Sequence, residues 1–205
     1  MAVDDMTKLF KHELGDLLFA EKTFLKGLKT MAKETSDPTI KERILVHADE
    51  TEGHIETLGR AFEAAGLKAK ATKCDAALGL KEEHDSFKEE EEPTPEILEA
   101  FNLGSGLRVE HYEIAGYRSA IVLAKSLGFD ESAALLAQNL AQEEAMAKFL
   151  ESQAAGALAG LAGETEEGAS VETSVEPEVS GRGRATNTSS TGRATVGRAS
   201  PGARR

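Results

Sequence analysis

The sequence predicts an all-α protein built around four long helices, and three observations support this prediction. Up to about residue 153 the chain is rich in Ala, Leu, Glu and Lys, which favour helices, and only 5% of all residues are aromatic. Apolar residues recur at helical spacing over four long segments. Start and stop signals separate these segments. About 150 residues can bury a full core without disulfides, so a bundle of this size is expected to be stable alone.

The first two helices are expected to form a hairpin. The first spans about residues 4–33, where leucines, phenylalanines and a methionine mark one face. Asp37 and Pro38 then form a restart signal, because Asp is a good N-cap and Pro is well tolerated at the first helical position. The second helix runs from there to about residue 65, and Gly66 is placed to end it in a left-handed conformation.

The second half repeats this arrangement after a long connection. Residues 75–92 are predicted to form a shorter helix within that connection. Thr94 is placed to cap a long helix over residues 95–127, which Gly128 should end. The last long helix is expected to span about residues 130–152.

Two helical hairpins joined by a long crossover are typical of a ferritin-like four-helix bundle. A three-helix or solenoid arrangement is the alternative, although no internal repeat of fixed period supports it. We therefore predict a bundle domain over residues 1–153. Residues 154–205 are rich in Gly, Ser, Thr and Arg and have too little apolar surface to offset the entropy cost of ordering, so they are predicted to be a disordered tail.

The charge distribution bears on partners and location. The net charge is -12, and residues 1–154 hold 18 Lys+Arg against 30 Asp+Glu. This acidic domain disfavours duplex DNA as the main partner, which leaves weak contact through the Arg-Gly tail as the exception. A single cysteine, Cys74, suits a reducing compartment. We identify neither a signal peptide nor an apolar run long enough for a membrane span, and therefore expect a cytoplasmic protein without a membrane partner.

Two glutamates interrupt the apolar stripe of the third long helix. Glu110 and Glu113 are three residues apart, so both lie on the face that carries Leu107 and Ile114. Buried carboxylates are costly unless something neutralises them, and a metal ion is a common solution.

The other long helices also carry polar residues where the pattern favours apolar ones. Glu21 interrupts the first helix, His47, Glu50 and His54 follow one another at spacings of three and four on the second, and Glu143 interrupts the last. Each alone has an ordinary structural explanation as a boundary residue, but four helices sharing the feature favour one site. No Glu-x-x-His element is present on the second or last helix, so the site would be rich in carboxylates.

Four segments of the chain resemble the YciE/YciF family. They are Leu14-Gly-Asp-Leu-Leu-Phe-Ala-Glu-Lys22, His47-Ala-Asp-Glu-Thr-Glu-Gly-His54, Val109-Glu-His-Tyr-Glu-Ile-Ala-Gly-Tyr117 and Gln142-Glu-Glu144. The resemblance covers about residues 5–153. It implies a ferritin-like, bacterial, stress-associated protein whose bundle can hold a di-metal centre.

The leading functional hypothesis is therefore a stress protein with two iron ions, manganese being possible, that reacts with O₂ or peroxide in a ferroxidase-like or peroxide-consuming reaction. The predicted metal ligands are Glu21, His47, Glu50, Glu110, Glu113 and Glu143, with His54 as a weaker candidate and Asp16 and His111 as residues that orient ligands. Tyr112 or Tyr117 could carry oxidising equivalents, although packing is the preferred role. A homodimer is expected.

Two other hypotheses stay open at this point. In the first, the protein is a non-catalytic helical stress protein that acts through partner binding and has a structural or vestigial metal site. In the second, the tail docks the bundle onto a larger assembly. Stoichiometric, redox-active metal binding is the property that separates the first alternative from the leading hypothesis.

Overall fold

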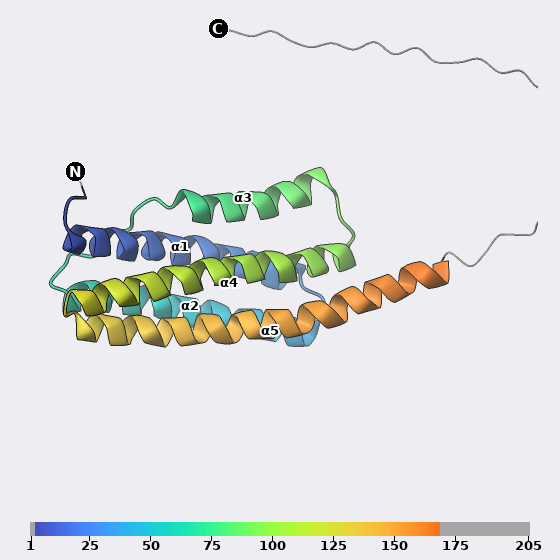
Figure 1. Cartoon of the computed structure of the whole chain (residues 1–205). Helices are drawn as coiled ribbons and strands as arrows, with labels where there is room; N and C mark the ends of the chain where they lie inside the picture. The colour runs from blue at the N-terminus through green and yellow to red at the C-terminus, as the bar shows by residue number, and fades with distance from the viewer. Residues whose placement is uncertain (1–2, 169–205) are drawn as a thin grey trace, which may run out of the picture. The chain divides into compact units, whose positions relative to one another are not determined.

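The computed structural model describes the backbone of residues 3–168 and the side chains of residues 3–161, and helices account for most of this part. Figure 1 shows four long helices side by side and a shorter one along the outside. The helices are α1 (Met6–Glu34), α2 (Pro38–Ala64), α3 (Asp75–Glu90), α4 (Pro95–Ser126) and α5 (Asp130–Gly168).

The helix boundaries follow the capping signals of the sequence. The Asp37 side chain accepts hydrogen bonds from two backbone N–H groups of the first turn of α2, and Thr94 accepts one at the start of α4. Gly66 and Gly128 have φ angles of 69° and 74°, a left-handed conformation that favours glycine after a helix end. The predicted starts of α2 and α4 are thus confirmed at the level of individual hydrogen bonds.

The four long helices form two antiparallel hairpins. The α1 and α2 helices pack together, as do α4 and α5, and the hairpins meet through α1 against α4 and α2 against α5. The connection between α2 and α4 carries the chain back along the bundle, and α3 within it packs on α1 and α4 (Figure 1). This arrangement confirms the predicted ferritin-like bundle.

Two apolar clusters lie in the four-helix bundle with a polar layer between them, and a third lies where α3 packs on α1 and α4. At one end of the bundle, the N-terminal part of α1 packs against the C-terminal part of α2 and against the turn end of the α4–α5 hairpin. This cluster includes Phe10, Leu14, Leu58, Phe62, Leu136 and Ile121. The cluster at the opposite end includes Leu28, Met31, Ile44, Leu103, Met146 and Leu150. Charged residues between them are therefore shielded from water on both sides.

The prediction for the end of α5 is wrong. We expected the helix to end near Ser152 and a disordered tail to begin at residue 154, whereas α5 continues to Gly168. The segment 154–162 is rich in Ala and Leu, which favour helix, and Ala154 and Ala157 pack against the second apolar cluster. The rest of the predicted tail, residues 169–205, lies outside the part that the structure describes.

Gly15 allows the crossover to lie close against α1, which gives a first prediction. A Cβ added at Gly15 would lie 2.4 Å from Thr72 Oγ1 and 2.8 Å from the Lys70 carbonyl oxygen, while the Gly15 carbonyl accepts a 2.8 Å hydrogen bond from the Thr72 amide. We expect Gly15→Ala to lower the free energy of unfolding by about 1–3 kcal/mol through overpacking.

Urea denaturation measures this effect. Gly104→Ala is the control, because a Cβ there meets nothing within 4 Å and the substitution should keep or raise helix stability. Equal stability of the two variants would contradict the assignment of a tight contact to Gly15.

Candidate metal centre

The polar layer in the middle of the bundle receives side chains from all four long helices. Its ionisable members are Glu21 of α1, His47 and His54 of α2, Glu110 and Glu113 of α4, and Glu143 of α5. Each of these residues is at most 3% exposed. Six buried ionisable groups at one level of a small bundle require mutual or external neutralisation.

Helical spacing brings these groups together. His47 and His54 are seven residues apart, about two turns of α2, so both rings face the bundle interior with centroids 6.1 Å apart. Glu110 and Glu113 are about one turn apart on α4. The level of Glu143 on α5 lies between Leu136 of the first apolar cluster and Leu150 of the second.

His54 is the centre of one group of potential ligands. Its Nδ1 atom lies 2.8 Å from Glu143 Oε1 and 3.4 Å from Glu21 Oε2. These three residues can each offer one ligand atom, and the offered atoms all lie within 4.8 Å of one another. A single cation between them would contact α1, α2 and α5.

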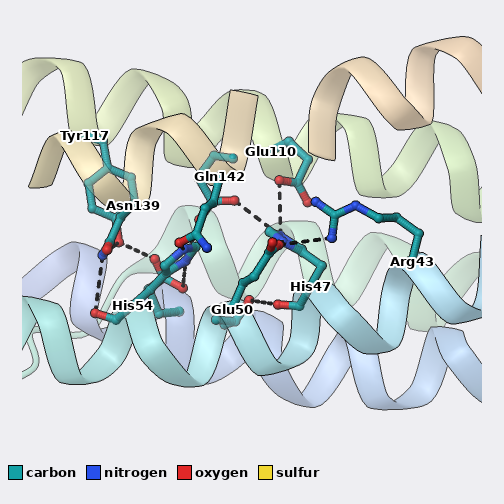
Figure 2. Close-up of polar contacts among 11 residues, drawn as sticks. Arg43, His47, Glu50, His54, Glu110, Tyr117, Asn139 and Gln142 are labelled. Atoms are coloured by element: carbon teal, nitrogen blue, oxygen red, sulfur yellow. Dashed lines mark hydrogen bonds and ion pairs between the residues drawn. The ribbon is translucent and has the colours of Figure 1, made fainter. Parts of the chain in front are cut away.

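His47 is the centre of a second group. Its Nε2 atom lies 3.3 Å from Glu143 Oε2 and 3.4 Å from Glu110 Oε2, again with ligand atoms within 4.8 Å of one another. Figure 2 shows Glu110 of α4 reaching across the bundle toward His47 of α2. Glu143 belongs to both groups and offers a different oxygen to each, which is the geometry of a bridging carboxylate.

Several of these buried atoms have no hydrogen-bond partner in the described part of the chain. They are Glu21 Oε2, His54 Nδ1, Glu110 Oε2, Glu113 Oε1 and both carboxylate oxygens of Glu143. The close approach of His54 to Glu143 is thus an ion-pair contact whose direction is wrong for a hydrogen bond. An unsatisfied buried polar group costs about 1–3 kcal/mol, and more when charged. These unpartnered nitrogen and oxygen atoms converge in the bundle interior, and atoms of this kind can bind a cation as ligands.

The pKa of each group in the cluster depends on burial and on the charges of the other groups. Burial raises the pKa of Glu110 to about 8 against the opposing effect of His47, and burial likewise raises the pKa of Glu21. Burial opposes the charge of His54, but the Glu143 and Glu21 carboxylates outweigh it and raise its pKa to about 10. His47 and His54 in turn hold the pKa of Glu143 below its usual range despite burial. The cluster therefore carries protons at neutral pH that a bound metal would displace.

Glu113 lies among the same carboxylates. Burial raises its pKa well above the usual range, and the negative charges of Glu21, Glu143 and Glu110 add to this effect. Glu113 Oε1 has no hydrogen-bond partner in the described part of the chain, and Glu113 is not a member of either ligand group.

A second set of residues fixes the two imidazole rings. Glu50 Oε2 lies 2.9 Å from His47 Nδ1 and accepts a 3.0 Å hydrogen bond from Arg43, while Gln142 Oε1 lies 2.9 Å from His54 Nε2 (Figure 2). These contacts occupy one nitrogen of each ring. The other nitrogen of each ring, His47 Nε2 and His54 Nδ1, is left facing the carboxylates, which is how metal-binding histidines are commonly held.

Glu21 is held from the opposite side. Tyr117 is fully buried and donates a hydrogen bond to Glu21 Oε1, which leaves Oε2 facing His54. Asn139 donates to the Tyr117 hydroxyl at 2.9 Å and to the His54 carbonyl at 3.3 Å, as Figure 2 shows. Asn139 thereby links α5, α4 and α2 around the site.

The structure separates the residues named from the sequence into three sets. Glu21, His47, His54, Glu110 and Glu143 meet in the two groups, although His54 was the weaker candidate. Glu113 lies beside them.

Glu50, Asp16 and His111 are placed elsewhere. The Glu50 side chain is 22% exposed and turned toward Arg43, outside both groups. Asp16 accepts a hydrogen bond from Tyr112, whose hydroxyl also lies 2.9 Å from Cys74 Sγ. His111 does not orient a ligand here, because its side chain is 58% exposed and faces Glu151 at 3.7 Å.

Arg43 and Asn139 are not among the residues named from the sequence, and Gln142 is named there only as part of a family-like segment, without a role. Asn139 has a detectable signal, because it lies four residues before Glu143 and hence on the same face of α5. Arg43 has no comparable signal, since it is an ordinary polar residue beside a buried one.

Comparison with known proteins places this chain in a family. Residues 5–172 match the family described as a domain of unknown function, DUF892. The chain belongs to the DUF892 family. Protein YciF of Escherichia coli K12 is 35% identical to it over 146 residues, which cover 71% of this chain and 87% of YciF. The predicted resemblance to the YciE/YciF family is thus confirmed.

Solved structures of similar proteins share the fold of this DUF892 member. The crystal structure of the E. coli stress protein YciF superimposes with a TM-score of 0.71 at 33% identity, covering 76% of this chain and 98% of YciF. YcfI of Rhodopseudomonas palustris gives a TM-score of 0.70 at 32% identity, covering 73% and 94% of the two chains. In the described part of the present chain, no helix is long and apolar enough to cross a membrane.

Proposed function

We propose that this protein binds two iron ions in the middle of its bundle and oxidises Fe²⁺ with O₂ or peroxide. The observation that carries the proposal is the pair of buried ligand groups that share Glu143, each with one histidine nitrogen and unpartnered carboxylate oxygens. Ferritin-like bundles build di-iron and di-manganese sites from such carboxylates and histidines on facing helices.

The chain offers a ligand set for each ion. Glu21 and His54 would hold one ion, Glu110 and His47 the other, and Glu143 would bridge them through its two oxygens. Glu113 is a candidate for a further ligand or bridge. Carboxylate and imidazole ligands suit iron and manganese, and bound iron would supply reversible one-electron chemistry at this site.

The surrounding residues would manage protons and water. Oxidation of two Fe²⁺ by one O₂ takes up two protons and releases two Fe³⁺ and one H₂O₂, whereas oxidation by H₂O₂ takes up two protons and releases two H₂O. Glu113, whose pKa is raised by burial and neighbouring carboxylates, is a buried acid next to the two groups that can donate or take up a proton. The two apolar clusters keep bulk water from the site along the bundle axis.

Anaerobic Fe²⁺ titration of the purified protein tests this proposal. Close to two iron ions per chain are expected, followed by a rapid absorbance change on addition of O₂ or H₂O₂. Glu110→Ala should lower metal occupancy sharply because it removes a ligand, whereas Glu56→Ala, on the exposed face of α2, should leave occupancy unchanged.

Two outcomes would contradict the proposal. Equal occupancy in the Glu110→Ala and Glu56→Ala variants would remove the ligand assignment. Wild-type protein that binds no Fe²⁺ would instead favour a non-catalytic bundle that acts through a protein partner.

A further inference from the structure

A pocket runs from the surface beside α3 to the acidic end of the candidate metal centre. It has a volume of about 120 Å³ and lies where α1, α3 and α4 meet. Its outer rim includes Lys81 and His84 of α3, and its inner lining includes Glu110 and Glu113. The pocket therefore connects solvent with the part of the polar layer that contains Glu110 and Glu113.

The wall between rim and inner end is mostly apolar. Leu28, Met31 and Val109 supply side chains, and Gly27 leaves space beside them open. Apolar cavities of this size class hold small uncharged molecules. Charged molecules would lose hydration along such a wall.

We propose that this pocket is the port through which a small apolar oxidant, dioxygen, reaches Glu110 and Glu113. The inference rests on the function proposed above for the chemistry at its inner end, while the pocket itself is independent of bound metal. Hydrogen peroxide is the less favoured source of oxidising equivalents, because most of the pocket surface is apolar and the Thr23 and Thr30 hydroxyls that line it already donate to backbone carbonyls.

Gly27 offers a way to close the port without disturbing the site. It lies in α1 on the pocket wall, and a Cβ added there would meet nothing within 4 Å, so a larger side chain has room to enter the pocket. Gly104 of α4 is the matched control: it is also a helical glycine with open space at its Cβ, and it does not line the pocket. Neither residue belongs to the proposed ligand set.

The first measurement uses metal-free protein and xenon as an apolar probe. In NMR spectra of wild-type protein under xenon pressure, the methyl signals of Leu28, Met31 and Val109 should shift. The shifts should be lost in Gly27→Leu and kept in Gly104→Leu. Gly27→Met, with a more flexible side chain, provides a second closed port if the leucine variant folds poorly.

The second measurement uses protein loaded anaerobically with Fe²⁺. Gly27→Leu and Gly27→Met should bind as much Fe²⁺ as wild type but react with O₂ at least tenfold more slowly, whereas Gly104→Leu should react at the wild-type rate. Unchanged rates with O₂ in both Gly27 variants would contradict the proposal that O₂ enters through this pocket. Slower reaction with H₂O₂ alone would overturn the assignment to an apolar oxidant.

The two proposals fail in different ways. Wild-type protein without Fe²⁺ binding would overturn the proposed function, and the xenon shifts would still decide whether the pocket admits an apolar molecule. If the wild type binds and oxidises iron normally but shows no xenon shifts, the proposed entry route is wrong and the proposed function stands.

Discussion

Glu143→Gln is expected to abolish binding of both metal ions, the largest effect of any single substitution in the site. Glu143 is the one residue shared by the two ligand groups, with Oε1 toward His54 and Oε2 toward His47. Gln retains the volume of the side chain but removes its charge and replaces one ligand oxygen by an amide nitrogen, which is a donor and not a ligand. Metal content after Fe²⁺ loading and desalting measures the effect.

The same substitution is expected to destabilise the metal-free protein. Glu143 lies between two buried histidines whose pKa values are raised, and it compensates their positive charges. Removing one partner of a buried ion pair costs about 3–5 kcal/mol, part of which the histidines can avoid by releasing a proton. We therefore expect a clearly lower free energy of unfolding in urea at pH 6, and a smaller deficit as the pH rises.

Glu144→Gln provides the control for both measurements. Glu144 is adjacent in sequence, but its side chain is 35% exposed and pairs with Arg118 at 2.7 Å. Exposed ion pairs contribute about 0–1 kcal/mol, so both metal content and stability should stay near those of the wild type. Retention of two iron ions by Glu143→Gln would contradict the bridging role.

The sequence predicts the fold well because the signals that determine it are local. Asp37 and Thr94 cap their helices through contacts within one turn, so their effect does not depend on the rest of the chain. The end of α5 was mispredicted for the opposite reason. Ala154 and Ala157 pack against an apolar cluster to which α1, α2 and α4 contribute as well as α5, and this packing is not visible in the composition of the segment.

The candidate site is predictable to the extent that polar residues interrupt apolar stripes. Glu21, Glu110 and Glu143 satisfy this criterion and are buried in the structure. On α2 the polar pattern favours Glu50 over His54 as a ligand, whereas at about 100° per residue His54 lies only about 20° from His47 around the helix and Glu50 about 60°. That difference turns the Glu50 carboxylate toward Arg43. Absolute spacing along a helix is therefore less informative than the angle around its axis.

Residues that support the site from a distance are not predictable in this way. The contact of Asn139 with Tyr117 joins α5 to α4, and that of Gln142 with His54 joins α5 to α2. Each depends on how two helices are rotated relative to each other. Rotation is a property of the packed bundle. The spacing of Asn139 from Glu143 therefore indicates the face on which Asn139 lies, but not its contact with Tyr117.

Glu110→Leu is expected to stabilise the metal-free protein while preventing metal binding at the His47 group. Four carboxyl groups and two imidazoles are buried together, so acids are in excess, and His47 keeps Glu143 and Glu50 as partners when Glu110 is lost. Replacing a buried ionisable group by an apolar one of similar volume is often neutral or stabilising by about 1–4 kcal/mol. Thermal unfolding in the presence of a chelator measures the change.

The pH dependence of this difference has a definite sign. The pKa of Glu110 is raised from 4.5 to about 8, so the folded metal-free protein retains a proton that the unfolded chain releases. The stability that this proton contributes is complete below pH 4.5 and is lost as the pH rises toward 8. Glu110→Leu has no such group to titrate, so it does not lose this stability. The difference in free energy of unfolding between the variant and the wild type should therefore grow between pH 5 and pH 8 and then level off.

Adding metal should make the wild type more stable than Glu110→Leu. This reversal distinguishes a metal ligand from a buried acid that only destabilises the fold. Saturating Mn²⁺ or anaerobic Fe²⁺ stabilises a folded state that binds it by about 3–4 kcal/mol at 100–1,000 times the dissociation constant. The wild type should gain this stabilisation and exceed Glu110→Leu, which should gain less. If the variant is less stable than the wild type in chelator, or gains as much from metal, Glu110 serves the packing of the bundle and not a metal ion.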